Sequence, residues 1–325
     1  MSFEPPEFRT GTVLPSEVAI ETVFGCNASC PMCFIDQPTE RQKRVMKMEV
    51  FERVVADLEP HKDHITRFDM WSLGEPFIDP YLEERVGYVK DRGFNHVAVS
   101  TNADLMTAER AQKIMEMGLD TLIISIDGTT AEVHEALRPG TNFELVDKNA
   151  REAVRIRDEN NYGTRFLIRF IEQGKNAHQW DAYREYWREQ LSQSRKDNAC
   201  RYRQHNYGGY TGNKQEMLGD NITEEMERMP CRYVFETLQV LSDGSLCLCP
   251  ADFLHASMGI GDVHKQSPIE AFNGERYRDI RELHACGEKN DMQICKDCTI
   301  LYSMYDREFL WEMVSHTHVP RRLQA

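Results

Sequence analysis

Apolar positions in the first two thirds of the chain follow two alternating spacings, one typical of strands and one typical of helices. Short runs rich in β-branched and aromatic residues predict strands at 18–24, 65–73, 96–100, 121–126, 165–171 and 200–206. Between them, apolar residues recur every three or four positions and predict helices at 46–58, 81–92, 107–117, 129–137, 143–158 and 177–191. Strands that alternate with longer helices indicate repeated βα units and a parallel sheet.

Six βα units are too few for a closed eight-stranded barrel and fit a partial barrel. In β/α barrels the reactive groups gather at the carboxyl ends of the strands, so the loops after the strands are where we expect the chemistry.

The pattern changes after residue 206. The glycine-rich segment 207–213 is typical of a loop, and Asp243-Gly244 between two apolar runs predicts a β-hairpin. Helices are predicted at 268–283 and 299–315. We therefore expect two domains, a barrel over 17–206 and a linker plus a small α+β domain over 207–325.

Composition narrows the possible functions. No apolar run approaches the roughly 20 residues that a membrane-spanning helix needs. The formal net charge is −14, which disfavours general nucleic-acid binding, because neutralising phosphates takes clustered Lys and Arg. The first residues show neither the basic nor the apolar region of a secretory signal, so we expect a cytoplasmic protein.

Ten cysteines without an export signal favour metal or redox chemistry over disulfides. Cys26, Cys30 and Cys33 follow the first predicted strand with the spacing C-x3-C-x2-C. Three thiolates on one short loop can hold three irons of a cubic [4Fe–4S] cluster and leave the fourth iron free to bind another molecule. A zinc knuckle is the alternative, although zinc usually takes four ligands in paired short spacings.

This loop resembles the signature of the radical S-adenosylmethionine (SAM) superfamily, in which the free iron chelates SAM. The resemblance implies a partial (β/α)6 barrel, a [4Fe–4S] cluster and SAM as cofactors, and an external one-electron reductant such as flavodoxin or ferredoxin. It also implies SAM-binding residues after successive strands, which match here at Gly74, Glu75, Ser100, Asn102, Ser125 and Arg138. The guanidinium of Arg138 suits the SAM carboxylate through bidentate hydrogen bonds.

A second set of cysteines has the pattern C-x12-G-x4-C followed by C-x2-C. It resembles the SPASM and twitch domains of the same superfamily. The lack of further cysteines after Cys298 favours the shorter twitch type, with one auxiliary [4Fe–4S] cluster. The implied ligands are Cys231, Cys249, Cys295 and Cys298. A zinc ribbon uses similar pairs and stays open as the alternative.

The resemblance implies a 5′-deoxyadenosyl radical that removes a hydrogen atom from a substrate. An auxiliary cluster that accepts an electron leads to oxidation, whereas a thiol that returns a hydrogen atom leads to epimerisation. Cys247 is the candidate hydrogen donor, with Cys200 and Cys286 as further candidates. Because Cys247 precedes Cys249 by two residues on a predicted strand, we expect both side chains to face the same way.

The sixteen residues before the first strand are too few for a leader-peptide-binding domain. We therefore expect a small-molecule substrate, such as a sugar or an aminocyclitol in a biosynthetic pathway, and an oxidoreductase or epimerase. The alternatives are a peptide-modifying maturase and, more remotely, a zinc-stabilised binding protein without catalytic activity.

Overall fold

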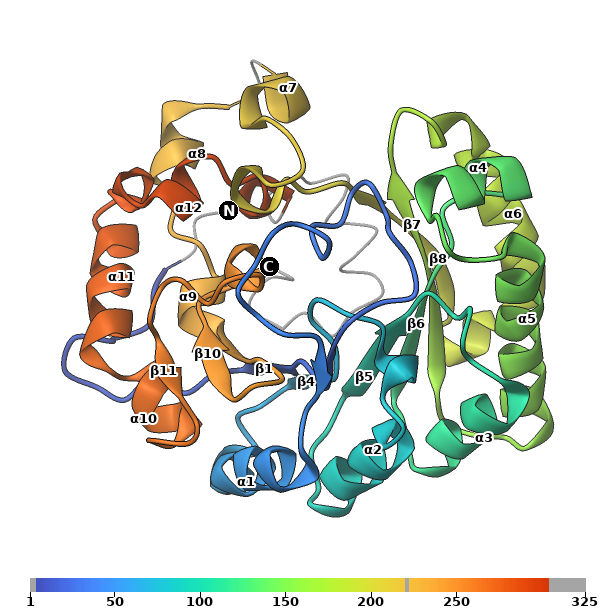
Figure 1. Cartoon of the computed structure of the whole chain (residues 1–325), viewed down its shortest axis with the longest axis horizontal. Helices are drawn as coiled ribbons and strands as arrows, with labels where there is room; N and C mark the ends of the chain where they lie inside the picture. Colours follow the sequence, from blue (N-terminus) through green and yellow to red (C-terminus); the bar gives the residue numbers. More distant parts are fainter. Residues whose placement is uncertain (1–3, 220–221, 304–325) are drawn as a thin grey trace.

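The computed structural model describes residues 4–219 and 222–303, and a curved nine-stranded sheet runs through them (Figure 1). Six strands are mutually parallel and follow one another along the chain: β1 (Glu17–Ile20), β4 (Arg67–Asp69), β5 (Val97–Thr101), β6 (Thr121–Ser125), β7 (Arg165–Glu172) and β8 (Asn198–Arg203). The helices of this part are α1 (Met48–Leu58), α2 (Leu82–Asp91), α3 (Ala108–Glu116), α4 (Ala131–Leu137), α5 (Phe143–Glu159) and α6 (Trp180–Gln190). The predicted partial (β/α)6 barrel is confirmed.

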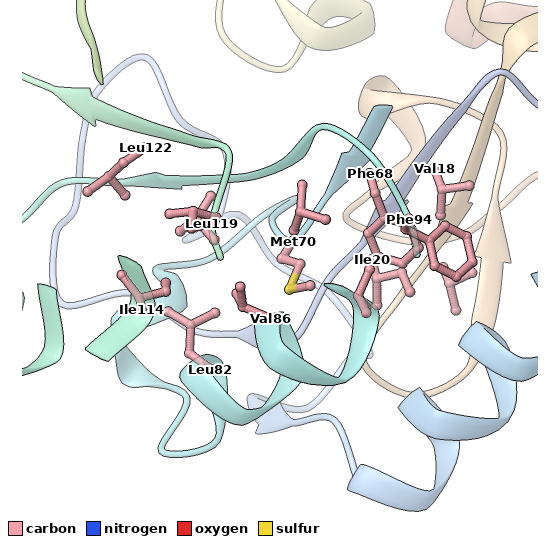
Figure 2. Close-up of a cluster of buried hydrophobic side chains, with 14 of the residues drawn as sticks. Val18, Ile20, Phe68, Met70, Leu82, Val86, Phe94, Ile114, Leu119 and Leu122 are labelled. Carbon is pink, nitrogen blue, oxygen red and sulfur yellow. The ribbon is translucent and has the colours of Figure 1, made fainter. Parts of the chain in front are cut away.

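The two faces of the sheet differ in chemistry, because successive side chains of a strand point to opposite faces. The outer face is apolar and packs against the helices. Figure 2 shows part of this packing, in which side chains of the first strands meet α2 and α3: Val18, Ile20, Phe68, Met70, Leu82, Val86 and Ile114.

The inner face carries the residues that alternate with this apolar set. Backbone pairing places Cys247, Gln239, Ala19, Asp69 and Ala98 in one row across five strands. Residues in one row share a face. These side chains therefore line the interior of the barrel.

The strand predicted at 18–24 is interrupted. After β1, the short strand β2 (Val23–Phe24) pairs with β3 (Arg44–Val45) in a separate two-stranded sheet. Glu21 follows β1, and its buried carboxylate binds the Arg41 guanidinium and accepts the Ser242 N–H at 3.1 Å. A buried charge needs such partners. The Glu21 N–H still donates to Val240 O at 2.8 Å, and the next residue, Thr22, accepts the Met46 N–H instead.

The C-terminal part extends the same sheet. β9 (Thr237–Val240) pairs in parallel with β1, and β10 (Ser245–Cys247) and β11 (Gly261–Asp262) follow as antiparallel strands. The predicted hairpin is present, with Gly244 at φ 90° in its turn. Because β9 joins β1, both parts share one sheet, and the division after residue 206 stays a prediction.

The helices of this part are short: α7 (Lys214–Leu218), α8 (Glu224–Arg228), α9 (Tyr233–Glu236), α10 (Pro268–Phe272), α11 (Glu275–Ala285), α12 (Gln293–Lys296) and α13 (Ile300–Ser303). The single helix predicted at 268–283 is two helices, because the backbone of Gly274 is extended, with ψ 164°, and α11 begins anew after it. At the end of α10, the Asn273 side chain binds the N-terminal arm. Its Nδ2 donates to Val13 O at 2.9 Å, and its Oδ1 accepts the Val13 N–H at 2.7 Å. The helix predicted at 299–315 is seen over α13, and its remainder lies outside the described residues.

None of the described helices combines the length and the apolar character that a membrane span requires.

Candidate active site

The cysteine loop (residues 25–34) follows β2 and is bound through its backbone from two sides. The Glu75 N–H donates to Gly25 O at 2.8 Å, and the Ser29 N–H donates to Pro139 O at 2.8 Å. Segments that are far apart in the sequence therefore set the shape of the loop.

Two glycines make this close approach possible. A Cβ on Gly74 would lie 2.2 Å from Val23 O, and a Cβ on Gly140 would lie 2.5 Å from Asn27 O. Real Cβ atoms do not come this close to a backbone oxygen. Gly140 also has φ 95°, a conformation that side chains with a Cβ rarely adopt. Gly74, which is predicted to contact SAM, therefore also allows the backbone before the cysteine loop to approach closely.

The three thiols of the loop share one partly buried environment. Burial raises the pKa of Cys26 to about 11 and that of Cys33 to about 12, and the neighbouring thiols add to both increases. Cysteine binds metals as the thiolate, so holding all three deprotonated takes a bound cation that offsets their repulsion.

The spacing of the donors indicates which cation fits. Within residues 4–219 and 222–303, no three Cys, His, Asp or Glu side chains converge tightly enough for a single metal ion. A zinc site brings every ligand within about 2.3 Å of one point, whereas a four-iron cluster spreads its thiolates over separate irons. The three thiolates of the loop are one fewer than the four ligands that a structural zinc ion usually takes, whereas a four-iron cluster can take three thiolates and leave one iron free.

Glu75 and Asn102 connect the strand ends to the cysteine loop. The buried Glu75 carboxylate accepts the Asn102 N–H at 2.8 Å, the Thr101 hydroxyl at 2.6 Å and the Phe77 N–H at 3.1 Å. Asn102 donates from Nδ2 to Asn27 Oδ1 at 2.9 Å. The Glu75 carboxylate is therefore occupied by the protein, and through Asn102 it is connected to the cysteine loop.

Ser100 and Ser125 are joined by a residue that the sequence analysis did not single out. Arg169 of β7 donates from Nη2 to Ser100 Oγ at 2.8 Å and to Ser125 Oγ at 2.7 Å. Its Nε is buried without a hydrogen-bond partner among the described residues, which calls for an acceptor from outside the protein. A signal was present in the sequence, because this arginine interrupts the apolar run 166–171.

Arg138 is already paired within the protein. Its Nε donates to Asp127 Oδ2 at 2.8 Å, and Asp127 Oδ1 accepts the Ile171 N–H at 2.6 Å. Burial lowers the pKa of Arg138, but the charges of Asp127 and Cys30 outweigh burial and raise it above its usual value. The guanidinium thus lies between a buried carboxylate and a thiol of the cysteine loop.

The second cysteine set lines one cavity, together with apolar side chains and two basic residues. The lining residues are Cys231, Cys249, Cys295, Cys298, Val234, Leu248, Ile294, Ile300, Leu301, Tyr233, His284 and Lys289. Burial, followed by the charge of Cys298, raises the pKa of Cys231 to about 12. Four mutually repelling thiols around one cavity fit a second cluster. His284 and Lys289 were not anticipated, and no local motif marks them.

The remaining cysteines lie in three different places. Cys247 is buried and packs with Phe34 and Leu73, whereas Cys249 lines the auxiliary cavity, so the predicted common orientation does not hold. The reason is that β10 ends at Cys247, and strand alternation stops there. Cys200 is buried inside the barrel, and Cys286 is exposed on the surface.

Comparison with protein families gives two matches. Residues 20–168 match the family described as the radical SAM superfamily. Residues 231–299 match SPASM, described as an iron-sulfur cluster-binding domain. The first match covers most of the barrel, and the second covers the four cysteines of the auxiliary cavity.

Two curated relatives illustrate the range of similar proteins. A tungsten-containing aldehyde ferredoxin oxidoreductase cofactor-modifying protein of Pyrococcus furiosus is 32% identical over 108 residues, 33% of this chain and 30% of that protein. Fe-coproporphyrin III synthase of Methanosarcina barkeri is 22% identical over 297 residues, 91% of this chain and 69% of that protein. The chain spans less than half the length of several relatives that it matches.

Two solved structures share the fold. BtrN in complex with AdoMet and 2-DOIA has a TM-score of 0.59 at 16% identity, covering 89% of this chain and 94% of that chain. Streptococcus suis SuiB bound to precursor peptide SuiA has a TM-score of 0.62 at 14% identity, covering 91% and 74%. One was solved with a small molecule and the other with a peptide, so the fold alone does not select the substrate class.

Proposed function

Because the chain belongs to the radical SAM superfamily and carries an iron–sulfur cluster-binding SPASM domain, we propose that it removes a hydrogen atom from a small polar molecule inside the barrel. The cofactors of such an enzyme are a [4Fe–4S] cluster, SAM and auxiliary iron–sulfur chemistry. When bound and reduced, the cluster and SAM supply a 5′-deoxyadenosyl radical that abstracts the hydrogen atom. The protein supplies binding, orientation and exclusion of water.

The proposed ligand sets follow the two thiol groups. Cys26, Cys30 and Cys33 hold the SAM-binding cluster, and Cys231, Cys249, Cys295 and Cys298 hold one auxiliary cluster. The two sets belong to the proposed domains, 17–206 and 207–325. An external one-electron reductant such as flavodoxin or ferredoxin is the proposed partner.

Gly74, Glu75, Ser100, Asn102, Ser125 and Arg138 are the proposed SAM contacts. Ser100 and Ser125 accept hydrogen bonds from Arg169. A hydroxyl that accepts through its oxygen still has its own hydrogen to donate. Arg169 therefore turns both serines into oriented donors, suited to the ribose and carboxylate oxygens of SAM.

The observation that carries the small-molecule proposal is the chemistry of the inner barrel face. Asp69 lies there in an ion pair with Arg67, at 2.9 Å between Oδ1 and Nε. Burial raises the pKa of Asp69 to about 7 even though Arg67 lowers it. Arg67 offsets part of the cost of burying the Asp69 carboxylate, and the two charged groups keep this part of the interior polar. They fit a hydroxylated or amine-bearing molecule, such as a sugar or an aminocyclitol.

Cys247 is the proposed hydrogen donor if the outcome is epimerisation. It shares a row with Gln239, Ala19 and Asp69, which places it on the same inner face. Burial raises the pKa of its thiol well above the usual value, so the S–H bond that a hydrogen donor needs is kept. Without such a donor, the auxiliary cluster is the electron acceptor and the product is oxidised.

The test is turnover of the anaerobically reconstituted protein with SAM, a reductant and candidate sugars or aminocyclitols. We expect about eight irons per chain, from two four-iron clusters, and 5′-deoxyadenosine formed in step with product. Epimerisation gives a product of unchanged mass in H2O and a product with one added deuterium in D2O. Oxidation gives a product that is two mass units lighter. Stimulation by a peptide alone favours the maturase alternative, and bound zinc without iron contradicts the proposal.

A further inference from the structure

His284, near the end of α11, is a buried side chain of the auxiliary cavity with one partner at each ring nitrogen. Its Nδ1 lies 3.1 Å from the backbone nitrogen of Cys231 and accepts that N–H. Its Nε2 lies 3.6 Å from Cys295 Sγ. Both partners belong to residues of the four-cysteine set.

The first contact determines the tautomer of the ring. A backbone N–H can only donate, so Nδ1 must be the unprotonated nitrogen that accepts. The neutral ring then carries its hydrogen on Nε2, the nitrogen that faces the Cys295 sulfur. An imidazolium would place a second donor against the Cys231 N–H, so this geometry selects the neutral form.

We propose that His284 is a positioning residue that donates an N–H···S hydrogen bond to the Cys295 thiolate and thereby raises the reduction potential of the auxiliary cluster. This inference rests on the proposed four-cysteine ligand set. Reduction adds negative charge to a cluster and its sulfurs, and a donor to sulfur stabilises that state. A higher potential makes the cluster a better acceptor for an electron from a substrate radical.

The effect of His284 on the cluster can be tested separately from the effects of the other groups around the cavity. Lys289 is also buried there, but its ammonium donates to the backbone carbonyl of Glu227. Backbone amides of Tyr233 and Gly208 donate to the sulfurs of Cys231 and Cys298 and offset part of the rise in pKa that burial causes. A side-chain substitution leaves those amides in place, whereas the donor at Cys295 can be removed by changing one residue.

Two substitutions separate the two contacts of the ring. In His284→Asn, the side-chain oxygen takes the place of Nδ1 and still accepts the Cys231 N–H, but no donor reaches Cys295. In His284→Gln, the amide nitrogen takes the place of Nε2 and keeps a donor near Cys295. The pair therefore tests the N–H···S hydrogen bond with a matched control.

The experiment is an anaerobic redox titration of the reconstituted full chain, followed by electron paramagnetic resonance, with iron determined on each sample. At a fixed potential, we expect the ratio of reduced to oxidised auxiliary cluster in His284→Asn to fall about tenfold, which is about 59 mV for a one-electron couple. His284→Gln should stay close to the wild type. Iron content should be unchanged in both variants.

Three outcomes overturn the proposal. An unchanged reduction potential in His284→Asn, at full iron content, refutes the hydrogen-bond proposal but leaves the auxiliary cluster in place. Loss of about four irons in both variants, or a strong coupling from 15N-labelled histidine to the wild-type cluster, makes His284 a ligand instead. A wild-type chain with only about four irons refutes the auxiliary cluster and this proposal together. A weak 15N coupling in the wild type supports the hydrogen bond without any substitution.

Discussion

The cysteine loop and the auxiliary cavity both gather thiols, but the protein holds them in different ways. The loop presents three thiols on eight consecutive positions and is bound by backbone contacts from Glu75 and Pro139. The auxiliary cavity collects four thiols from three segments and surrounds them with apolar side chains.

This difference matches two tasks. In metal sites generally, a full set of protein ligands serves a closed site, whereas an incomplete set leaves a position for a reacting molecule. The loop has polar neighbours at the strand ends, such as Ser100 and Asn102, which suit a bound ligand. The walls of the cavity are mostly Leu, Ile and Val, which suit a centre that only exchanges electrons.

Removing one thiol from each region should give the largest and most distinct effects. We expect Cys33→Ala to abolish 5′-deoxyadenosine formation and to lower iron from about eight to about four per chain. Cys249→Ala should lower iron by the same amount but keep SAM cleavage, because the cysteine loop is intact. Iron analysis and chromatography of deoxyadenosine measure both. If both variants lose 5′-deoxyadenosine formation, or both keep it, the two thiol sets do not have separate tasks.

The second prediction concerns the close backbone contact between Gly140 and the cysteine loop. In Gly140→Ala, the new Cβ meets Asn27 O in a backbone at φ 95°, which strains the loop by about 1–3 kcal/mol. We expect a several-fold loss of iron from the loop cluster with the auxiliary cluster intact. Gly174→Ala is the matched control, since a Cβ there meets nothing within 4 Å. Equal iron in both variants means that the close approach is not needed.

Arg169 should matter for SAM more than for iron. Arg169→Met removes the donor shared by Ser100 and Ser125, and losing a charged hydrogen bond costs about 1.5–3 kcal/mol. We expect SAM to bind roughly 10- to 100-fold more weakly, measured by calorimetry on reconstituted protein. Arg201→Met, which removes a partly exposed ion pair with Glu172, should leave SAM affinity near the wild type.

The smallest effect concerns pH and His134, which is buried beside Asp127. Burial, followed by the charge of Arg138, lowers the pKa of His134 to about 3, against about 6.5 in the unfolded chain. Below pH 6.5 the unfolded state binds the extra proton, so stability falls as the pH falls, by about 2 kcal/mol at pH 5. His134→Gln should lose this part of the pH dependence. Urea titrations of both proteins at pH 7 and pH 5 measure the free energy of unfolding. If the wild type and His134→Gln lose the same free energy between the two pH values, the prediction is wrong.

Much of the fold was predictable because it follows from local patterns. The six strands and their helices appear close to where the apolar spacing predicted them, although β4 covers only Arg67–Asp69 of the predicted 65–73. At the start of α3, the Thr107 hydroxyl accepts the Arg110 N–H at 3.2 Å as a helix cap. The errors lie where a distant partner intervenes. The first strand ends before Glu21, which binds Arg41 and Ser242, and the predicted helix is divided after Asn273, which binds Val13.

By itself, the sequence determined the number of βα units and the two cysteine patterns, because periodicity and short spacings are properties of neighbouring residues. Only the tertiary structure placed Arg169 between two serines, paired Arg138 with Asp127, and brought His284 to Cys231 and Cys295. These contacts join residues that lie between 11 and 69 positions apart in the sequence, and no local pattern encodes them. The cysteine loop could be recognised because its three thiols lie on eight consecutive positions, whereas the environment of the auxiliary thiols exists only after folding.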